Sequence, residues 1–195
     1  MTATVLGGAL SLVVSACGGD DNEAEQQPRT TTTEADPTTT TLNPEEAARN
    51  EVIAAREAAD EAEIEAWGPP APNPDLPALK DTHTGLMLDR VVSTARGLTR
   101  NGLAIEYPDD SQYRLEVTSI SFQTVDGQEV AFLEVCGVDD GQQVVVATGT
   151  PVSELSGRVT TTEASEAMRK EDGVWKLAER REDSHQEGVV GCAAN

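Results

Sequence analysis

The sequence predicts an α+β domain in which N-terminal helices pack on an antiparallel β-sheet. Two stretches, residues 45–67 and 85–100, repeat apolar side chains at spacings of three and four, as amphipathic helices do. After Gly102 the pattern changes to short β-rich runs separated by aspartate–glycine pairs, which are strong signals for hairpin turns. Helices followed by an antiparallel sheet define the α+β class.

Residues 1–16 are predicted to form a signal peptide. The apolar stretch 5–16 is shorter than the ~20 residues that a membrane-spanning helix needs and has the length of a signal-peptide core. Residues 14–17 (Val-Ser-Ala-Cys) resemble the bacterial lipobox, which implies that the thiol of Cys17 carries a diacylglycerol and that the chain is cut before it. The alternative is an ordinary secretory signal with a chance cysteine. Because residues 1–4 contain no lysine or arginine, we expect the translation start to lie upstream.

Residues 17–44 are expected to form a lipid-anchored, disordered stalk. The segment contains two threonine runs and several acidic residues, and Leu42 is its only large apolar residue. It therefore cannot bury enough apolar surface to offset the entropy of ordering. Residues 45–195 follow, and their number, about 150, is typical of one domain.

The composition limits the partners that this domain can bind. The chain has 14 basic and 35 acidic residues and a net charge of −21. Such a charge repels nucleic acid and anionic lipid headgroups, so we expect no nucleic-acid partner. Aromatic residues make up only 3% of the chain, so the core must consist mainly of valine, leucine, isoleucine and alanine.

The first predicted helix covers residues 45–67, and its small apolar residues form one stripe: Ala48, Val52, Ala55, Ala59, Ala62 and Ala66. Residues 68–74 (GPPAPNP) interrupt the chain, and Asp75 is predicted to cap a short helical segment that ends near Leu79. The second long helix covers residues 85–100 and is closed by an Asn-Gly pair. Its core side is expected to consist of Leu88, Val92, Ala95 and Leu98.

The predicted strands cover residues 102–107, 113–122, 128–136, 142–148, 157–170 and 174–182. In the second strand the apolar alternation shifts phase between Val117 and Ile120, which indicates a β-bulge. Aspartate–glycine pairs at 126–127, 140–141 and 172–173 predict three hairpin turns. Together these signals predict an antiparallel meander.

Cys136 and Cys192 are the two cysteines that remain once Cys17 is lipidated. In an oxidising compartment outside the membrane we expect them to form a disulfide. The alternatives are two buried free thiols or a metal-binding pair. Two cysteines in a chain with only two histidines make a poor zinc site, so we expect no metal.

This order of elements resembles the SnoaL-like, nuclear transport factor 2-like domains found behind lipoprotein signals in actinobacteria. The resemblance covers most of residues 45–195 and is carried by DLPAL (75–79), EVCGVDDGQQVVVATGTPV (134–152), GVWKLAERRE (173–182) and the late GC pair. It implies a cone, in which helices close over a strongly curved sheet and leave a pocket at the wide end. It also implies pairing of Cys136 with Cys192.

No catalytic residue is predicted, although relatives on this scaffold use pocket carboxylates, sometimes with histidine. Glu116 and Glu134 alternate with apolar residues and are expected to face solvent. A turn accounts for Asp139 and Asp140. No carboxylate is expected to stand alone at an apolar position.

The two histidines are predicted to lie in loops. His83 is expected to have a polar loop or capping role, with a dyad to the neighbouring Asp81 as the alternative. His185 is expected in an exposed loop after the last strand. Four side chains are predicted to line the pocket, with core packing as the alternative for each: Tyr113, Phe132, Met168 and Trp175. No phosphate loop or other cofactor motif is present, and we expect no cofactor.

We therefore expect a non-catalytic accessory lipoprotein, anchored through Cys17 to the outer face of the bacterial cytoplasmic membrane. It is expected to bind a small apolar ligand or a cell-envelope protein in or near the cone. The alternative is a SnoaL-like extracytoplasmic enzyme, such as an isomerase, cyclase or hydrolase, that uses a pocket carboxylate or histidine. The sequence carries no signal for an oligomeric state.

Overall fold

The computed structural model describes residues 43–152, 158–188 and 192. The predicted signal peptide, the lipid-attachment residue Cys17 and nearly all of the predicted stalk lie outside the described residues. Within these ranges three helices precede two antiparallel sheets, which is the predicted α+β order. No helix in the described part of the chain combines the length and the apolar character that crossing a membrane requires.

The helices begin and end at local signals in the sequence. Helix α1 (Pro44–Trp67) starts where the side chain of Asn43 accepts a hydrogen bond from the backbone N–H of Glu45. Helix α2 (Pro77–Thr82) follows the proline-rich break and is capped by Leu76, so the prediction of Asp75 as the cap is wrong by one residue. Helix α3 (Gly85–Asn101) ends at Gly102, whose φ of 66° is the left-handed conformation expected there.

A four-stranded antiparallel sheet has the order β2-β3-β6-β7 and consists of β2 (Arg114–Val125), β3 (Gln128–Asp139), β6 (Thr160–Glu171) and β7 (Val174–Glu187). Two-residue turns with positive φ, Asp126-Gly127 and Asp172-Gly173, join its outer pairs and confirm two of the predicted hairpins. The predicted bulge in β2 is also confirmed, between Val117 and Ser119.

The third predicted hairpin, at residues 140–141, is wrong. Strand β4 (Gln142–Val145) pairs with β1 (Leu103–Glu106) and with β5 (Thr150–Pro151) in a second sheet, whereas β3 pairs with β6. The buried carboxylate of Asp140 accepts hydrogen bonds from Ser111 Oγ and the backbone N–H of Gln112. These bonds tie the bend to the segment before β2, and the chain turns towards β1 instead of folding back on β3.

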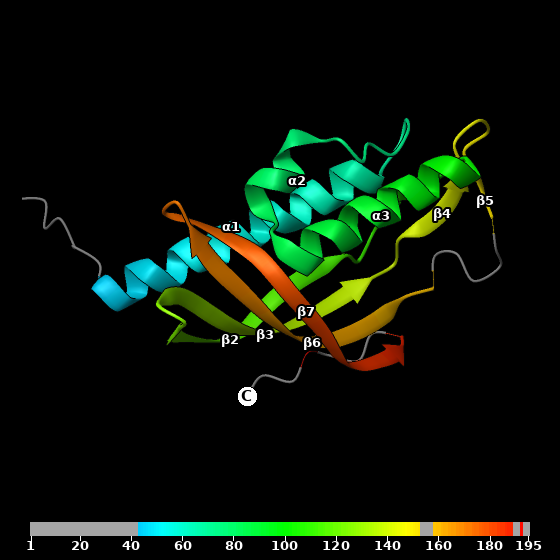
Figure 1. The fold of residues 1–195 in the computed structure, drawn as a ribbon. Helices are drawn as coiled ribbons and strands as arrows, with labels where there is room; N and C mark the ends of the chain where they lie inside the picture. The colour runs from blue at the N-terminus through cyan, green and yellow to red at the C-terminus, as the bar shows by residue number, and fades with distance from the viewer. Residues whose placement is uncertain (1–42, 153–157, 189–191, 193–195) are drawn as a thin grey trace, which may run out of the picture. The chain divides into compact units, whose positions relative to one another are not determined.

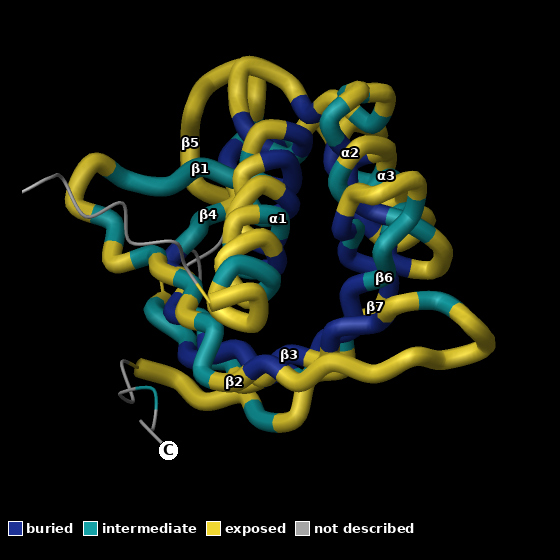
Figure 2. Tube along the Cα trace, turned by 90° about the vertical axis from the view of Figure 1, so that its left-hand side faces the viewer, coloured by how far each residue is buried: buried dark blue, intermediate teal, exposed yellow. Residues whose placement is uncertain are grey.

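The three helices lie on one face of the four-stranded sheet (Figure 1). Figure 2 shows that buried segments face one another across these two layers. Apolar residues of both layers form one core, which includes Val52, Leu79, Met87, Val91, Leu133, Met168 and Leu177. In α3 the most buried residues are Met87, Val91, Ala95 and Leu98, whereas the predicted core residues Leu88 and Val92 are only partly buried.

Candidate functional site

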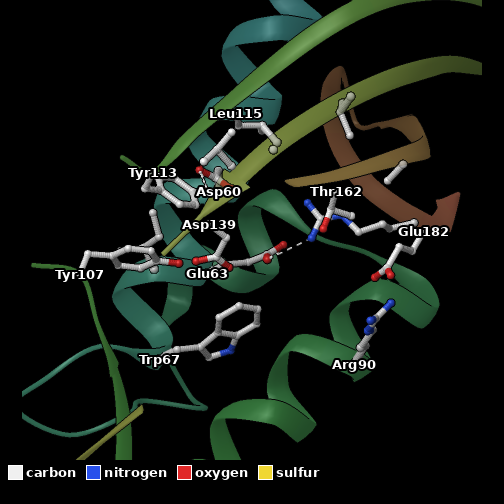
Figure 3. A pocket seen from close by; sticks show the side chains of 16 residues that line it. Asp60, Glu63, Trp67, Arg90, Tyr107, Tyr113, Leu115, Asp139, Thr162 and Glu182 are labelled. Carbon is white, nitrogen blue, oxygen red and sulfur yellow. Dashed lines mark hydrogen bonds and ion pairs between the residues drawn. The ribbon is translucent and has the colours of Figure 1, made fainter. Parts of the chain in front are cut away.

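A cavity of about 200 Å³ opens between α1, α3 and the four-stranded sheet (Figure 3). Helix α1 contributes three polar or aromatic side chains to its wall, and α3, the strands of the sheet and the segments next to β1 and β2 contribute the rest. The polar and aromatic lining residues are Asp60, Glu63, Trp67, Arg90, Tyr107, Tyr113, Asp139, Thr162, Arg180 and Glu182. The apolar part of the lining includes Ile64, Leu115, Val135, Val138 and Ala164.

A buried carboxylate, Glu166, lies behind the cavity wall and joins the helices to the sheet. Arg56 of α1 donates to both of its oxygens, at 2.5 and 3.1 Å. Arg180, the neighbour of Glu166 on β7, donates from Nε to Oε1 at 2.6 Å. Arg56 and Glu166 are almost completely buried, so this is an ion pair within the core rather than on the surface.

Glu63 extends this network to the cavity. Its Oε1 accepts a hydrogen bond from His83 Nε2 at 2.9 Å, and its Oε2 lies 3.6 Å from Arg180 Nη1. Burial alone would raise the pKa of Glu63, but the hydrogen bond from His83 and the charges of Arg180 and Arg56 outweigh burial and lower the pKa. Glu63 is therefore held as a carboxylate in the wall.

Asp60 lies one turn before Glu63 in α1 and has the opposite shift. Burial raises its pKa, and neither the hydrogen bond from the Tyr113 hydroxyl nor the charge of Arg56 compensates fully. The Tyr113 hydroxyl donates to Asp60 Oδ2 at 2.5 Å, and Arg56 Nη1 lies 3.6 Å from Asp60 Oδ1. Arg56 Nη1 itself is buried and makes no hydrogen bond to the described residues.

Two polar groups at the same end of the cavity are not used by this network. The hydroxyl of Tyr107 points towards the carboxylates of Asp139 and Glu63 in Figure 3, and it has no hydrogen-bond partner among the described residues. Asp139 Oδ1 accepts only from the backbone N–H of Gly141, two residues along its own turn. The rings of Tyr107 and Tyr113 meet edge to face, with centroids 4.8 Å apart.

The predicted pocket residues are divided between cavity, core and surface. Tyr113 lines the cavity. Met168 and Trp175 are buried in the core, because both lie on strand faces covered by the helices. Phe132 is 38% exposed and lines a separate hollow on the other face of the sheet, because its neighbours Leu133 and Ala131 take the core positions of β3. The solvent-facing predictions for Glu116 and Glu134 agree with the structure.

The expectation that no carboxylate stands at an apolar position is wrong for Glu63 and Glu166. Glu63 falls within the buried stripe of α1, and Glu166 alternates with Ala164 and Met168 on the core side of β6. A charged residue at an apolar position of a repeat indicates a buried charge. Arg56, four residues after Val52 on the buried side of α1, is another example.

His83 caps the end of α2, as one of its two predicted roles, by donating its backbone N–H to the Leu79 carbonyl, but the loop predictions for the two histidines need correction. His83 is 1% exposed and pairs with Glu63 of α1, while Asp81 is exposed, so the alternative dyad is not formed. A parallel bridge from His83 to Leu177 and a hydrogen bond from the N–H of Thr84 to the Leu177 carbonyl draw this segment into the core. His185 is exposed as expected, but it lies within β7 rather than after it.

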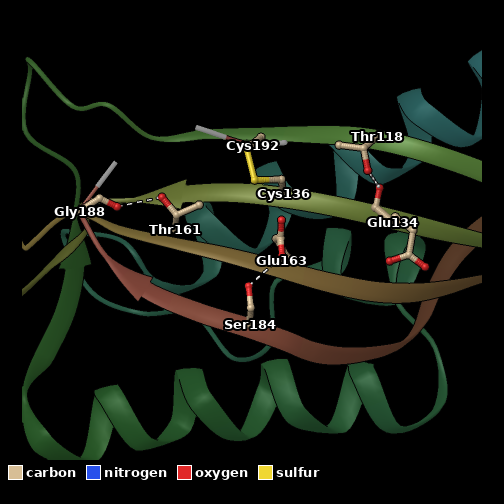
Figure 4. The surroundings of a disulfide bond; sticks show 8 residues. All are labelled: Thr118, Glu134, Cys136, Thr161, Glu163, Ser184, Gly188 and Cys192. Atoms are coloured by element: carbon tan, nitrogen blue, oxygen red, sulfur yellow. Dashed lines mark hydrogen bonds between the residues drawn. A yellow bond between two sulfur atoms is a disulfide. The ribbon is translucent and has the colours of Figure 1, made fainter. Parts of the chain in front are cut away.

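The described ranges contain no group of three or more histidine, cysteine, aspartate or glutamate side chains placed to hold a metal ion. Cys136 and Cys192 are joined by a disulfide with a Cα–Cα distance of 5.7 Å (Figure 4). Val135 and Gly137 line the cavity, so Cys136 between them points to the opposite face of the sheet. The disulfide thus fastens residue 192 to the outer face of β3.

No family model and no curated protein matches the chain. The fold is similar to the crystal structure of the intermembrane-space region of the chloroplast protein ARC6, with a TM-score of 0.53, 17% sequence identity and coverage of 73% of this chain and 97% of that one. A de novo designed β-sheet protein studied by NMR is 18% identical and covers 73% of this chain and 95% of its own, but its TM-score of 0.29 supports no argument. The similarity to the ARC6 region bears on the fold alone.

The disulfide should contribute about 4 kcal/mol to the free energy of unfolding, because it closes a loop with a sequence separation of 56 residues. Replacing both cysteines, Cys136→Ala with Cys192→Ala, should lower the unfolding free energy by that amount in urea denaturation followed by tryptophan fluorescence. Reductant should destabilise the native chain similarly and leave the double variant unchanged. A native chain that is insensitive to reductant would contradict the assignment.

Glu63→Gln should destabilise the fold by about 2–3 kcal/mol at pH 7, because it removes the negative partner of His83 and Arg180. The folded-state pKa of Glu63 is lowered, so its stabilising effect is complete above its ordinary pKa of 4.5 and is lost as pH falls through the folded-state value. The difference between native and variant chains should therefore shrink below about pH 4.5. Glu61→Gln, an exposed change on the same helix, is the control and should have almost no effect.

Proposed function

We propose that this protein is a lipid-anchored, extracytoplasmic domain that binds a small polar molecule in the cavity between α1 and the sheet. The observation that carries the proposal is the cavity wall. In it the Tyr107 hydroxyl and the Asp139 carboxylate make no hydrogen bond to each other, and the rings of Trp67 and Tyr113 line the wall with them. A few placed polar groups among apolar and aromatic side chains are typical of small-molecule sites.

The wall is also held in place before any ligand arrives. Trp67 donates from its ring nitrogen to the carbonyl of Val91, at 3.3 Å, and Tyr113 is held by Asp60. Glu63 is fixed by His83 on one side and Arg180 on the other. Side chains that are already ordered lose little further entropy on binding, which favours affinity.

The lining changes the expected chemistry of the ligand from apolar to polar. A dry apolar cavity would suit the small apolar ligand that the sequence predicts. Such a ligand would, however, desolvate the Tyr107 hydroxyl, which has no hydrogen-bond partner among the described residues, and the Asp139 carboxylate, which has one. The volume of about 200 Å³ lies below the ~300–1,000 Å³ typical of drug-sized ligands, so the ligand is small.

The proposal includes the cellular setting and the fold relationship that the sequence predicts. Cys17 is the proposed lipid-attachment residue, and the Cys136–Cys192 disulfide supports an oxidising, extracytoplasmic compartment. The finer relationship to the SnoaL-like, nuclear transport factor 2-like cone is supported by the order of helices before sheet and by a cavity between those layers.

A second candidate function, an extracytoplasmic enzyme, is favoured by Asp60. Its pKa is raised by burial in the cavity wall, which is the direction of shift found in carboxyl groups that act as acids or bases in catalysis. If the native chain converts the bound molecule to a product and Asp60→Asn binds it without conversion, the enzyme replaces the binding domain as the function.

Native mass spectrometry of the protein, purified gently from its own cell envelope, tests the binding function. We expect a reproducible excess mass on the native chain. Tyr107→Ala should lower the ligand-bound fraction by about tenfold, the loss typical of truncating a central aromatic contact. Phe132→Ala, on the opposite face of the sheet, should keep it. A bare mass for the native chain would contradict the proposal.

The anchor can be tested separately by fractionation of cells. Cys17→Ser should move the protein from the membrane fraction to the soluble extracytoplasmic fraction, because anchoring by acyl chains depends on that thiol. The native chain should carry the added mass of a diacylglycerol, and the exposed change Glu61→Gln should leave both that added mass and the membrane fraction unchanged. Membrane retention of Cys17→Ser would show that another segment holds the protein there.

A further inference from the structure

We propose that the molecule bound in this cavity is an organic cation, an ammonium compound held between carboxylates and aromatic rings. This inference rests on the proposed small-molecule function and adds the chemical class of the ligand. The charges of the lining, the arrangement of the rings and the size of the cavity support this class of ligand.

The cavity has more negative than positive groups available to a ligand. Four carboxylates line it, those of Asp60, Glu63, Asp139 and Glu182, against two arginines, Arg90 and Arg180. Arg180 is already engaged, because it donates to Glu166 and lies 3.6 Å from Glu63. Asp139 has no ion-pair partner in the described chain. A cation entering this site therefore meets the uncompensated negative charge of Asp139.

Aromatic rings lie at the same end of the cavity as Asp139. In Figure 3 the Asp139 carboxylate lies between the Tyr107 hydroxyl and the Glu63 carboxylate, with the Trp67 ring below Glu63 in the view, and Tyr113 packs edge to face against Tyr107. Within the described residues no lysine or arginine is stacked on these rings, whereas Lys170 stands over Trp175 elsewhere in the domain. Aromatic rings and carboxylates that line one cavity are the arrangement by which proteins bind quaternary ammonium groups.

The electrostatic environment of Tyr107 agrees with this geometry. Burial raises the pKa of its hydroxyl, and the negative charges of Asp139, Asp60 and Glu63 raise it further. Each of these charges opposes a phenolate at the hydroxyl position. The same charges stabilise a cation placed there.

Anions and metal ions fit the site less well. Arg90 is exposed and stands at the other end of the cavity, across from Glu182, so no unpaired buried cation awaits an anion. Metal ions need several close ligands, and the described ranges contain no such group. A volume of about 200 Å³ accommodates a small organic ammonium compound.

The test compares choline with 3,3-dimethyl-1-butanol, which has the same shape but carries carbon in place of the charged nitrogen. Binding to the full mature chain is measured by calorimetry, with tetramethylammonium and ethanolamine as further cationic probes and acetate and inorganic phosphate as anionic ones. We expect choline to bind at least tenfold more tightly than its neutral counterpart.

Asp139→Asn is the matching variant, because the amide oxygen can still accept from Gly141 while the charge is removed. It should weaken choline binding by about tenfold or less, and leave the neutral compound unaffected. Glu134→Gln removes one charge from the same strand on the exposed outer face and should change neither. Equal losses in the two variants would mean that only net charge matters and would overturn the inference.

The failure of this inference is distinguishable from failure of the proposed function. If the neutral or anionic probes bind as tightly as the cations, or if the envelope-purified protein carries a neutral or anionic molecule, the cation is wrong and small-molecule binding stands. If none of the probes binds and the purified protein carries no added mass, both proposals fall.

Discussion

The rest of the structure depends on the buried carboxylate of Glu166 and the two arginines that bind it. Arg56 reaches it from α1 and Arg180 from β7, so one residue of β6 connects the helix layer to two strands. Arg180 in turn approaches Glu63, and Glu63 binds His83 at the end of α2. One chain of charged contacts inside an otherwise apolar core thus positions helices α1 and α2 against strands β6 and β7.

Such a network is a costly way to hold a fold together. Burying charges loses their hydration, and apolar residues of similar volume often serve stability equally well. The network does, however, fix positions that apolar packing leaves adjustable, since each hydrogen bond has a direction. Its carboxylates Glu63 and Asp60 form part of the cavity wall. The unfavourable burial of charge therefore occurs where a ligand site needs polar groups in fixed positions.

Sequence reasoning predicted the features that local signals determine. The helices, two of the aspartate–glycine hairpins, the β2 bulge and the left-handed Gly102 each follow from a few adjacent residues. The network was missed because its partners lie far apart in the chain, as Arg56 and Glu166 do with a sequence separation of 110. A charge within an apolar series marks each partner, but only the tertiary structure identifies the pairs.

The wrong hairpin and the unpredicted polar end of the cavity have one physical origin. The bend at residues 139–141 sends β4 to β1, and this pairing brings Tyr107, just after β1, against Gly141. A side chain on Gly141 would have its Cβ 3.0 Å from the Tyr107 ring, so a larger residue would force the ring or its neighbours to shift by a few tenths of an ångström. Asp140 fastens the same bend to residues before β2, next to Tyr113. A simple hairpin between β3 and β4 would have given neither tyrosine this place, and the polar end of the cavity would not exist.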